Sequence, residues 1–130
     1  MTRAVSIGLK IPDNAAYTAL VALRRMRVPV EHVERSEIWL FDDDGDGAAL
    51  GDRVRADETI FNPNKHRLVL LESAAPRPGE VWIEPLEPGG RCKAIAWRLW
   101  EGERVPASHY VLAAAVERLL CNPAIEKAVY

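Results

Sequence analysis

The sequence predicts an α+β fold, and two observations carry this prediction. A strand, a helix and a second strand follow one another within residues 1–42, and a helix followed by a short apolar segment closes the chain. Between these ends lie β-like runs separated by turn-forming residues, a pattern typical of antiparallel strands. With 130 residues, of which 48% are apolar and 28% charged, the chain has the composition of one globular domain.

The N-terminal segment alternates apolar residues with polar or small ones. This period of two predicts a strand with one face on a core, and its apolar positions are Val5, Ile7, Leu9 and Ile11. A helix is predicted from Ala15 to Arg27. Either Asp13 or Asn14 can cap it, because the side-chain oxygen of each can accept a hydrogen bond from a free N–H of the first turn.

A second strand is predicted from Val33 to Phe41. Its apolar residues lie on both faces, since Ile38 and Leu40 alternate with Trp39 and Phe41. Two interpretations stay open. The strand is covered by a helix on one side and by a second subunit on the other, or the two aromatic residues lie under loops of the same chain.

The middle of the chain predicts a β-meander. Residues Asp42 to Asp57 read as an acidic loop. Three β-like runs follow, separated by Ala-Ala-Pro-Arg-Pro-Gly and Glu-Pro-Gly-Gly-Arg, which are turn-forming sequences. The runs are Leu68 to Glu72, Glu80 to Leu86 and Ala94 to Glu101.

A second long helix is predicted after Pro106, with Ser108 as its cap. It reaches Cys121 and ends there, because Asn122-Pro123 cannot continue it. The segment from Ile125 to Tyr130 is then a short strand or a last helical turn. Together the two ends fit a ferredoxin-like βαββαβ plait with an inserted β-meander. We expect a single domain, 1–130, with the plait core at 4–42 and about 94–130 and the insertion at about 43–93.

Two pieces of sequence resemble a known family. The segment Leu119 to Glu126, LLCNPAIE, resembles the LLANPVIE ending of the small S subunit of phosphoribosylformylglycinamidine synthase. At the front, Leu9-Lys10 and Asp13 to Ala16 are similar to part of that family's strand–helix–strand. The match covers residues 4–42 and 108–130. The inserted region departs from the family pattern, so a divergent paralogue is an alternative to the orthodox subunit.

The resemblance implies a non-catalytic protein. The cytoplasm is the expected compartment, because the N-terminus lacks the long apolar run of a signal peptide. Subunits of the family form dimers or tetramers, and they bridge the large synthase subunit and the glutaminase subunit of a purine-biosynthesis amidotransferase complex. The implied protein uses no cofactor and has no catalytic residues of its own. The alternative is a small-molecule-binding regulatory module on the same plait, with its ligand at a subunit interface.

The acidic loop is a candidate site for a divalent cation. Asp42, Asp44 and Asp46 have the spacing of the first ligands of an EF-hand loop, and Gly47 follows them. Position 12 of such a loop is a bidentate Glu, but here it is Arg53. We therefore favour a solvated acidic loop and expect no metal site.

A second candidate site is the turn before the first β-like run of the middle region. Lys65, His66 and Arg67 offer three donors that suit a phosphate, although a solvated turn explains them equally well. The serines lie in no nucleophile motif, and the chain contains no Walker or Gly-x-Gly-x-x-Gly sequence. These absences agree with a protein that has no catalytic activity of its own.

Four aromatic residues are candidates for an oligomer interface, because large aromatic side chains are enriched at interface centres, although filling the chain's own core is the alternative for the tryptophans. Trp97 and Trp100 are three residues apart and should face opposite sides of their strand. The other two candidates are Trp39 and Phe41. A net charge of −2 disfavours nucleic acid as a partner. No apolar run approaches the roughly 18 residues of a membrane span, so a membrane is not expected as a partner either.

Overall fold

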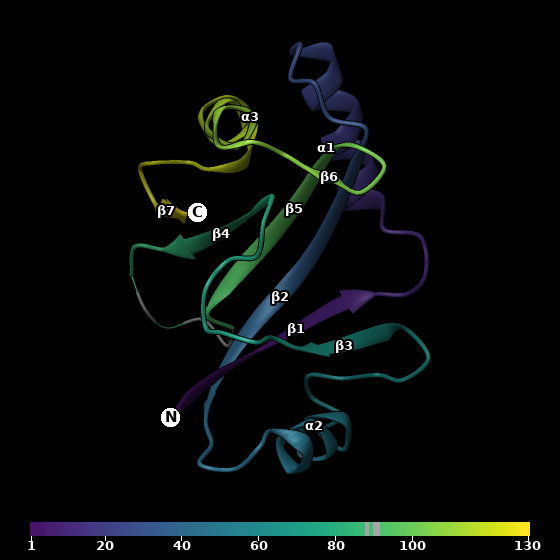
Figure 1. The fold of residues 1–130 in the computed structure, drawn as a ribbon, viewed down its shortest axis with the longest axis vertical. Helices are drawn as coiled ribbons and strands as arrows, with labels where there is room; N and C mark the ends of the chain where they lie inside the picture. The colour runs from purple at the N-terminus through teal and green to yellow at the C-terminus, as the bar shows by residue number, and fades with distance from the viewer. Residues whose placement is uncertain (88, 90–91) are drawn as a thin grey trace.

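The protein is seen here in a computed structural model, which describes residues 1–87, 89 and 92–130. Over these residues the fold is α+β, as the sequence predicts (Figure 1). The described strands form one seven-stranded sheet in the order β3-β1-β2-β5-β4-β7, with β6 attached to β5. Every pairing between described strands is antiparallel.

The elements follow the predicted order with two additions. The strands are β1 (Thr2–Leu9), β2 (His32–Asp42), β3 (His66–Leu70), β4 (Glu80–Pro85), β5 (Ala94–Gly102), β6 (Val105–Pro106) and β7 (Glu126–Val129). The helices are α1 (Asn14–Arg25), α2 (Ala48–Arg55), α3 (His109–Ala115) and a π-helix, η1 (Val116–Leu120). The additions are β6 and α2. The final segment, left open between strand and helical turn, is a strand.

The predicted helix caps are present. Asp13 caps α1, and its Oδ1 accepts a hydrogen bond from the backbone N–H of Ala16 at 3.1 Å. Ser108 caps α3 by accepting from the N–H of Val111 at 3.3 Å. Each cap satisfies a donor that the helix leaves free, which fixes where the helix begins.

The prediction of a loop from Asp42 to Asp57 is wrong, because α2 lies within it. Gly47 precedes the helix with a φ of 91°, a left-handed conformation that suits glycine. Leu50 and Val54 lie four residues apart on one side of α2 and are buried against Val5 and Ile7 of β1. This tertiary burial stabilises a helix too short to form alone.

The sheet does not confirm a ferredoxin-like plait. In a plait, the strands joined by the first helix run parallel with another strand between them. Here β1 and β2 are direct antiparallel neighbours, from Thr2 opposite Asp42 to Gly8 opposite Ser36. The terminal strand β7 pairs with β4 rather than with β1. Two parallel strands with a third strand between them do occur at other places in this sheet. β2 and β3 flank β1, and β5 and β7 flank β4, and each flanking pair runs antiparallel to the strand between them.

The predicted meander is wrong for its first strand. β4 and β5 pair as expected, but β3 pairs with β1 at the far edge of the sheet. The physical reason is the connection of residues 71–79, which is long enough to cross the sheet instead of forming a tight turn. The turn predicted at 87–91 lies partly outside the described residues.

The two faces of the sheet are covered differently. On one face, which we call the helical face, Val33, Val81 and Leu99 pack with α1 and α3, while Val5 and Ile7 pack with α2. The opposite face carries Gly8, Ser36, Ala96 and Trp82, which are cross-strand partners and so point the same way. We call it the arginine face. Leu71, at the start of the 71–79 connection, packs there with Trp82 and Ala96.

Candidate functional site

A pocket forms where β1 and β2 diverge. Their pairing ends at Gly8 and Ser36, yet β2 continues to His32 beside β5. β1 instead follows β3, and the N–H of Lys10 donates to the carbonyl of Lys65 at 2.8 Å. Figure 1 shows the two strands separating below α1. The resulting gap is a pocket of about 380 Å³, which Ser6, Gly8, Ser36 and Arg67 line together with residues of α1 and β5.

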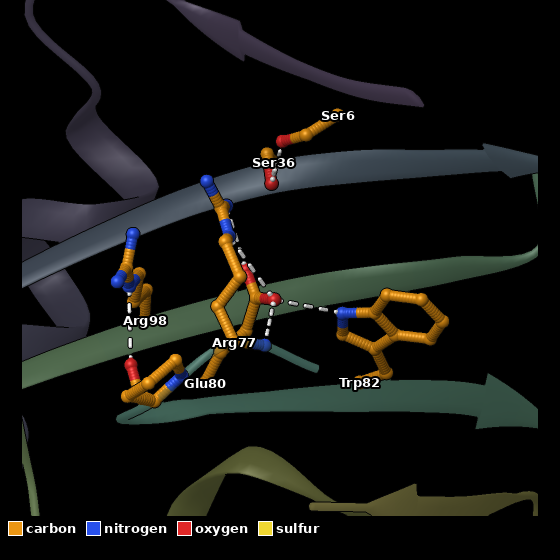
Figure 2. A network of polar contacts seen from close by, with 7 residues as sticks. Ser6, Ser36, Arg77, Glu80, Trp82 and Arg98 are labelled. Carbon is orange, nitrogen blue, oxygen red and sulfur yellow. Dashed lines mark hydrogen bonds and ion pairs between the residues drawn. The ribbon is translucent and has the colours of Figure 1, made fainter. Parts of the chain in front are cut away.

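Small residues form the floor of the pocket on the arginine face. Gly8 lies between Ser36 on one neighbouring strand and Arg67 on the other. Ser6 Oγ donates a hydrogen bond to Ser36 Oγ at 2.9 Å (Figure 2). Because these side chains are short, they leave a depression on this face of the sheet between the longer side chains around them.

Arginines from three separate segments surround this floor. Arg67 comes from β3, Arg98 from β5, and Arg77 from the 71–79 connection. Figure 2 shows Arg77 lying across β5 toward β2 and Ser36, with Arg98 beside it. Arg35 also lines the pocket, and its guanidinium lies 5.7 Å from the ring centre of Trp97 on the helical face. The pocket therefore concentrates positive charge.

Arg77 is held by a buried carboxylate. Its Nη2 lies 2.8 Å from Oε2 of Glu80, and its backbone N–H donates to Oε1 at 2.9 Å. Trp82 Nε1 donates to the same Oε1 at 3.0 Å (Figure 2). The side chain of Glu80 is fully buried, so these donors replace the water that the carboxylate loses. Arg77 is thus fixed in place by contacts within the chain.

Arg98 is also oriented by its surroundings. Its Nε donates to the carbonyl of Pro78 at 3.1 Å, and its guanidinium lies 5.1 Å from the ring centre of Trp100. Burial lowers the pKa of Arg98, as does the nearby Arg77, while Glu80 and Glu34 act in the opposite direction. The positive charges of these two guanidinium groups repel each other, and an anion bound next to both would offset that repulsion.

The remaining lining is mixed. Asp13 and Glu34 are the carboxylates at the pocket wall, and Glu34 Oε1 lies 3.3 Å from His32 Nε2. Apolar and aromatic residues lie toward α1, and they are Leu9, Ala16, Tyr17, Leu20 and Val33. Arg67, Arg77 and Arg98 thus form a cationic part on the arginine face, and an apolar part lies beneath the helix, where a fourth lining arginine, Arg35, lies over Trp97.

The structure divides the predicted phosphate site. Arg67 lines the pocket, but His66, its neighbour on β3, faces the other side of the sheet. There His66 Nδ1 accepts from the N–H of Asn62 at 2.9 Å, and its ring lies 5.9 Å from that of Phe61. Lys65 precedes β3 and is absent from the pocket lining among the described residues.

The acidic loop makes contacts within the chain. Asp43 forms ion pairs with Arg3 Nε at 3.1 Å and with Arg53 Nη2 at 3.7 Å; the Arg3 contact lacks the alignment of a hydrogen bond. Of the residues predicted as possible ligands, Asp46 accepts from the N–H of Ala48 at 3.0 Å and Asp44 lies 3.3 Å from the N-terminal amine. The third, Asp42, ends β2 opposite Thr2. Within the described residues, no three His, Cys, Asp or Glu side chains are placed to share a metal.

The aromatic interface candidates lie on both faces. Trp39 and Phe41 pack on the helical face against the cluster formed by α2 and β1. Trp97 packs on the same face near α1, whereas Trp100 lies on the arginine face, 5.2 Å from the ring centre of His32. The prediction that Trp97 and Trp100 point in opposite directions is confirmed.

Comparisons with models of known protein families, with curated proteins and with solved structures find no match to this chain. In the part of the chain that the structure describes, no helix has the length and apolar character needed to cross a membrane. The evidence for function is therefore the site itself.

Sequence reasoning missed most of this pocket. Neither Arg77 nor Arg98 is a site candidate in the sequence, and Ser6 and Ser36 count only among the serines that lie in no nucleophile motif. A weak signal exists at Arg98, a charged residue between the apolar Trp97 and Leu99, whereas Ser6 occupies an ordinary polar position of an alternating strand. Which strands would be neighbours could not be read from that signal.

Proposed function

We propose that the protein is a binding module for a small organic or inorganic anion, held in the pocket between β1 and β2. One observation carries the proposal. Arg67, Arg77 and Arg98 converge on one pocket of about 380 Å³, although the whole chain has a net charge of −2. It corresponds to the alternative expectation from the sequence, a small-molecule-binding regulatory module, with the ligand placed in a pocket of one chain instead of at a subunit interface.

The chemistry of the lining favours recognition of a negative charge. A guanidinium stays protonated at neutral pH, so it serves as a fixed donor and charge rather than as a proton-transfer group. Arg77 and Arg98 each keep N–H groups with no partner among the described residues, after their contacts to Glu80 and Pro78. A carboxylate or phosphate can accept hydrogen bonds from these groups, and such charge-assisted bonds are strong.

The test is an NMR titration of the full chain with inorganic phosphate and with acetate. We expect amide shifts at Gly8 and Ser36 that saturate, and binding about tenfold weaker in Arg98→Gln, because a hydrogen bond to a charged group is lost. Arg25→Gln is the matched control, since Arg25 is an exposed arginine of α1 outside the pocket lining. Equal affinity in both variants, or no shifts at the pocket, would refute the proposal.

A second candidate is the structural role implied by the resemblance to the small synthase subunit, on a ferredoxin-like plait. Its support in the fold is the edge strand β7, beside which Ile125, Val129 and Tyr130 are exposed apolar residues. Such an edge suits pairing with another subunit in a dimer or tetramer. In this proposal the protein acts in the cytoplasm with a large synthase subunit and a glutaminase subunit. Co-purification with the large subunit from lysate tests it, and a monomer by light scattering at high concentration counts against it.

A further inference from the structure

We infer that the ligand is an organic anion with a single charged head group and a short, uncharged apolar or aromatic body. The head group binds Arg67, Arg77 and Arg98, and the body lies under α1. This inference rests on the proposed function and adds the chemical class of the ligand.

The pocket reaches from the arginine face to α1 because the N-terminal part of β2 has no described strand paired to one of its edges. Beyond Ser36, β2 has β5 on one side and has lost β1 on the other. The pocket passes this edge, so it is lined by Ser36 and Arg98 of the arginine face and also by Val33 of the helical face. A ligand that fills it must contact both kinds of surface.

The part under α1 is built for an apolar group. Val33 and Ala16 are each 6% exposed and form its inner wall, where Leu9 and Leu20 join them. Tyr17, by contrast, is 68% exposed although it lines the pocket. An aromatic ring in this position gains by covering an apolar ligand, since its apolar surface then leaves water.

The head-group end holds a donor besides the guanidinium groups. Ser6 Oγ donates to Ser36 Oγ, so the hydroxyl hydrogen of Ser36 has no acceptor among the described residues. It lies on the floor beside Gly8, between Arg67 and Arg98 in the sheet. Ser36 can therefore donate to an oxygen of the same anion that the arginines bind.

The charge on the body is limited by Asp13. This carboxylate lines the pocket at the start of α1, and one of its oxygens is engaged by the N–H of Ala16. A second negative charge on the ligand body would face it, which is unfavourable in a partly buried site. The volume of about 380 Å³ lies near the lower end of small-ligand pockets, which limits the body to a short chain or one ring.

The experiment compares matched ligands on the full chain by calorimetry. Phenyl phosphate is compared with inorganic phosphate, and phenylacetate with acetate. We expect each phenyl compound to bind at least about tenfold more tightly than its small partner, because the ring is removed from water. Methyl shifts of Leu20 and Val33 in NMR should accompany the phenyl compounds alone.

Two variants separate the head from the body. Tyr17→Ser should weaken phenyl phosphate and leave inorganic phosphate unchanged, while Arg98→Gln should weaken both. Tyr110→Ser is the control, since Tyr110 is 86% exposed and lies outside the pocket lining. Equal affinity for phosphate and phenyl phosphate, unaffected by Tyr17→Ser, would overturn the inference and leave anion binding intact. Failure of every anion to bind would instead refute the proposed function.

Discussion

The carboxylate of Glu80 and the guanidinium of Arg77 form an ion pair of 2.8 Å, in which the acid is fully buried and the base is 27% exposed. This pair joins β4 to the connection that crosses the arginine face. Because Trp82 donates to the same carboxylate, the buried charge has donors from both its own strand and the connection. The position of Arg77 at the pocket thus depends on a group outside the pocket lining.

Glu80→Ala should destabilise the fold strongly. It leaves Arg77 without its partner and the indole N–H of Trp82 without an acceptor. Breaking a buried pair costs about 3–5 kcal/mol, and we expect the low end because Arg77 can regain water. Urea denaturation measures the free energy of unfolding. Glu103→Ala, at an exposed position, serves as the control. A loss below about 1 kcal/mol would show that the pair is weaker than its burial implies.

Gly79→Ala should disturb the same connection. Gly79 has a φ of 74°, and a Cβ there would lie 2.6 Å from the carbonyl oxygen of Leu99. The backbone strain alone costs about 1–3 kcal/mol, so we expect a lower melting temperature and weaker anion binding through displacement of Arg77. Gly45→Ala is the matched control, since its Cβ would meet nothing closer than 3.8 Å. Unchanged stability of Gly79→Ala would contradict this account.

In the acidic loop, substituting Asp43 should lower the thermal stability more than substituting Asp44. The side chain of Asp43 is 13% exposed and pairs with Arg3 and Arg53, whereas Asp44 is fully exposed. Asp43→Asn should therefore lower the thermal midpoint, and Asp44→Asn should leave it unchanged. Calcium should not raise the midpoint of the native chain, because Arg53 stands where an EF-hand loop has its bidentate Glu. A clear rise with micromolar calcium, lost in Asp44→Asn, would contradict this prediction.

Cys92 should react slowly in the folded protein. Burial raises the pKa of its thiol, and Glu37 raises it further. The thiolate is the reactive form, so alkylation at pH 8 should be slower in the native chain than in urea, with its pH midpoint shifted upward. The stabilisation from the neutral thiol is present below the unfolded pKa and is lost as pH rises through the folded pKa. The rates are measured in Cys121→Ser. A native midpoint at or below the unfolded one would refute the assignment.

Much of the secondary structure could be predicted because its signals are local. The alternation of Val5, Ile7 and Leu9 gave β1, although Ile11 lies beyond its end, and Ser108 gave the start of α3. The order of strands was not predictable in the same way. Nothing in the run from Leu68 indicates that it pairs with β1 instead of β4, because its alternation indicates which residues share a face but not which strand lies beside it.

The site was predictable only at Arg67. The pocket depends on β1 ending its pairing with β2 at Gly8, which is a property of the whole sheet. Arg77 and Arg98 become neighbours because residues 71–79 cross the sheet from β3, at one edge, to β4, which pairs with β5. Such convergence of distant segments leaves no spacing in the sequence that a motif search can detect.

The short side chains of the pocket floor have a consequence for how this protein could diversify. A Cβ at Gly8 would lie 3.4 Å from the carbonyl oxygen of Arg35, which is an ordinary contact distance. A methyl group can therefore be added there without moving the backbone. Exchanging Gly8 for alanine would add a methyl group to the pocket floor and so shorten the longest ligand that the pocket admits. Selectivity by size and attraction to charge are in this way carried by different residues, and each can change without the other.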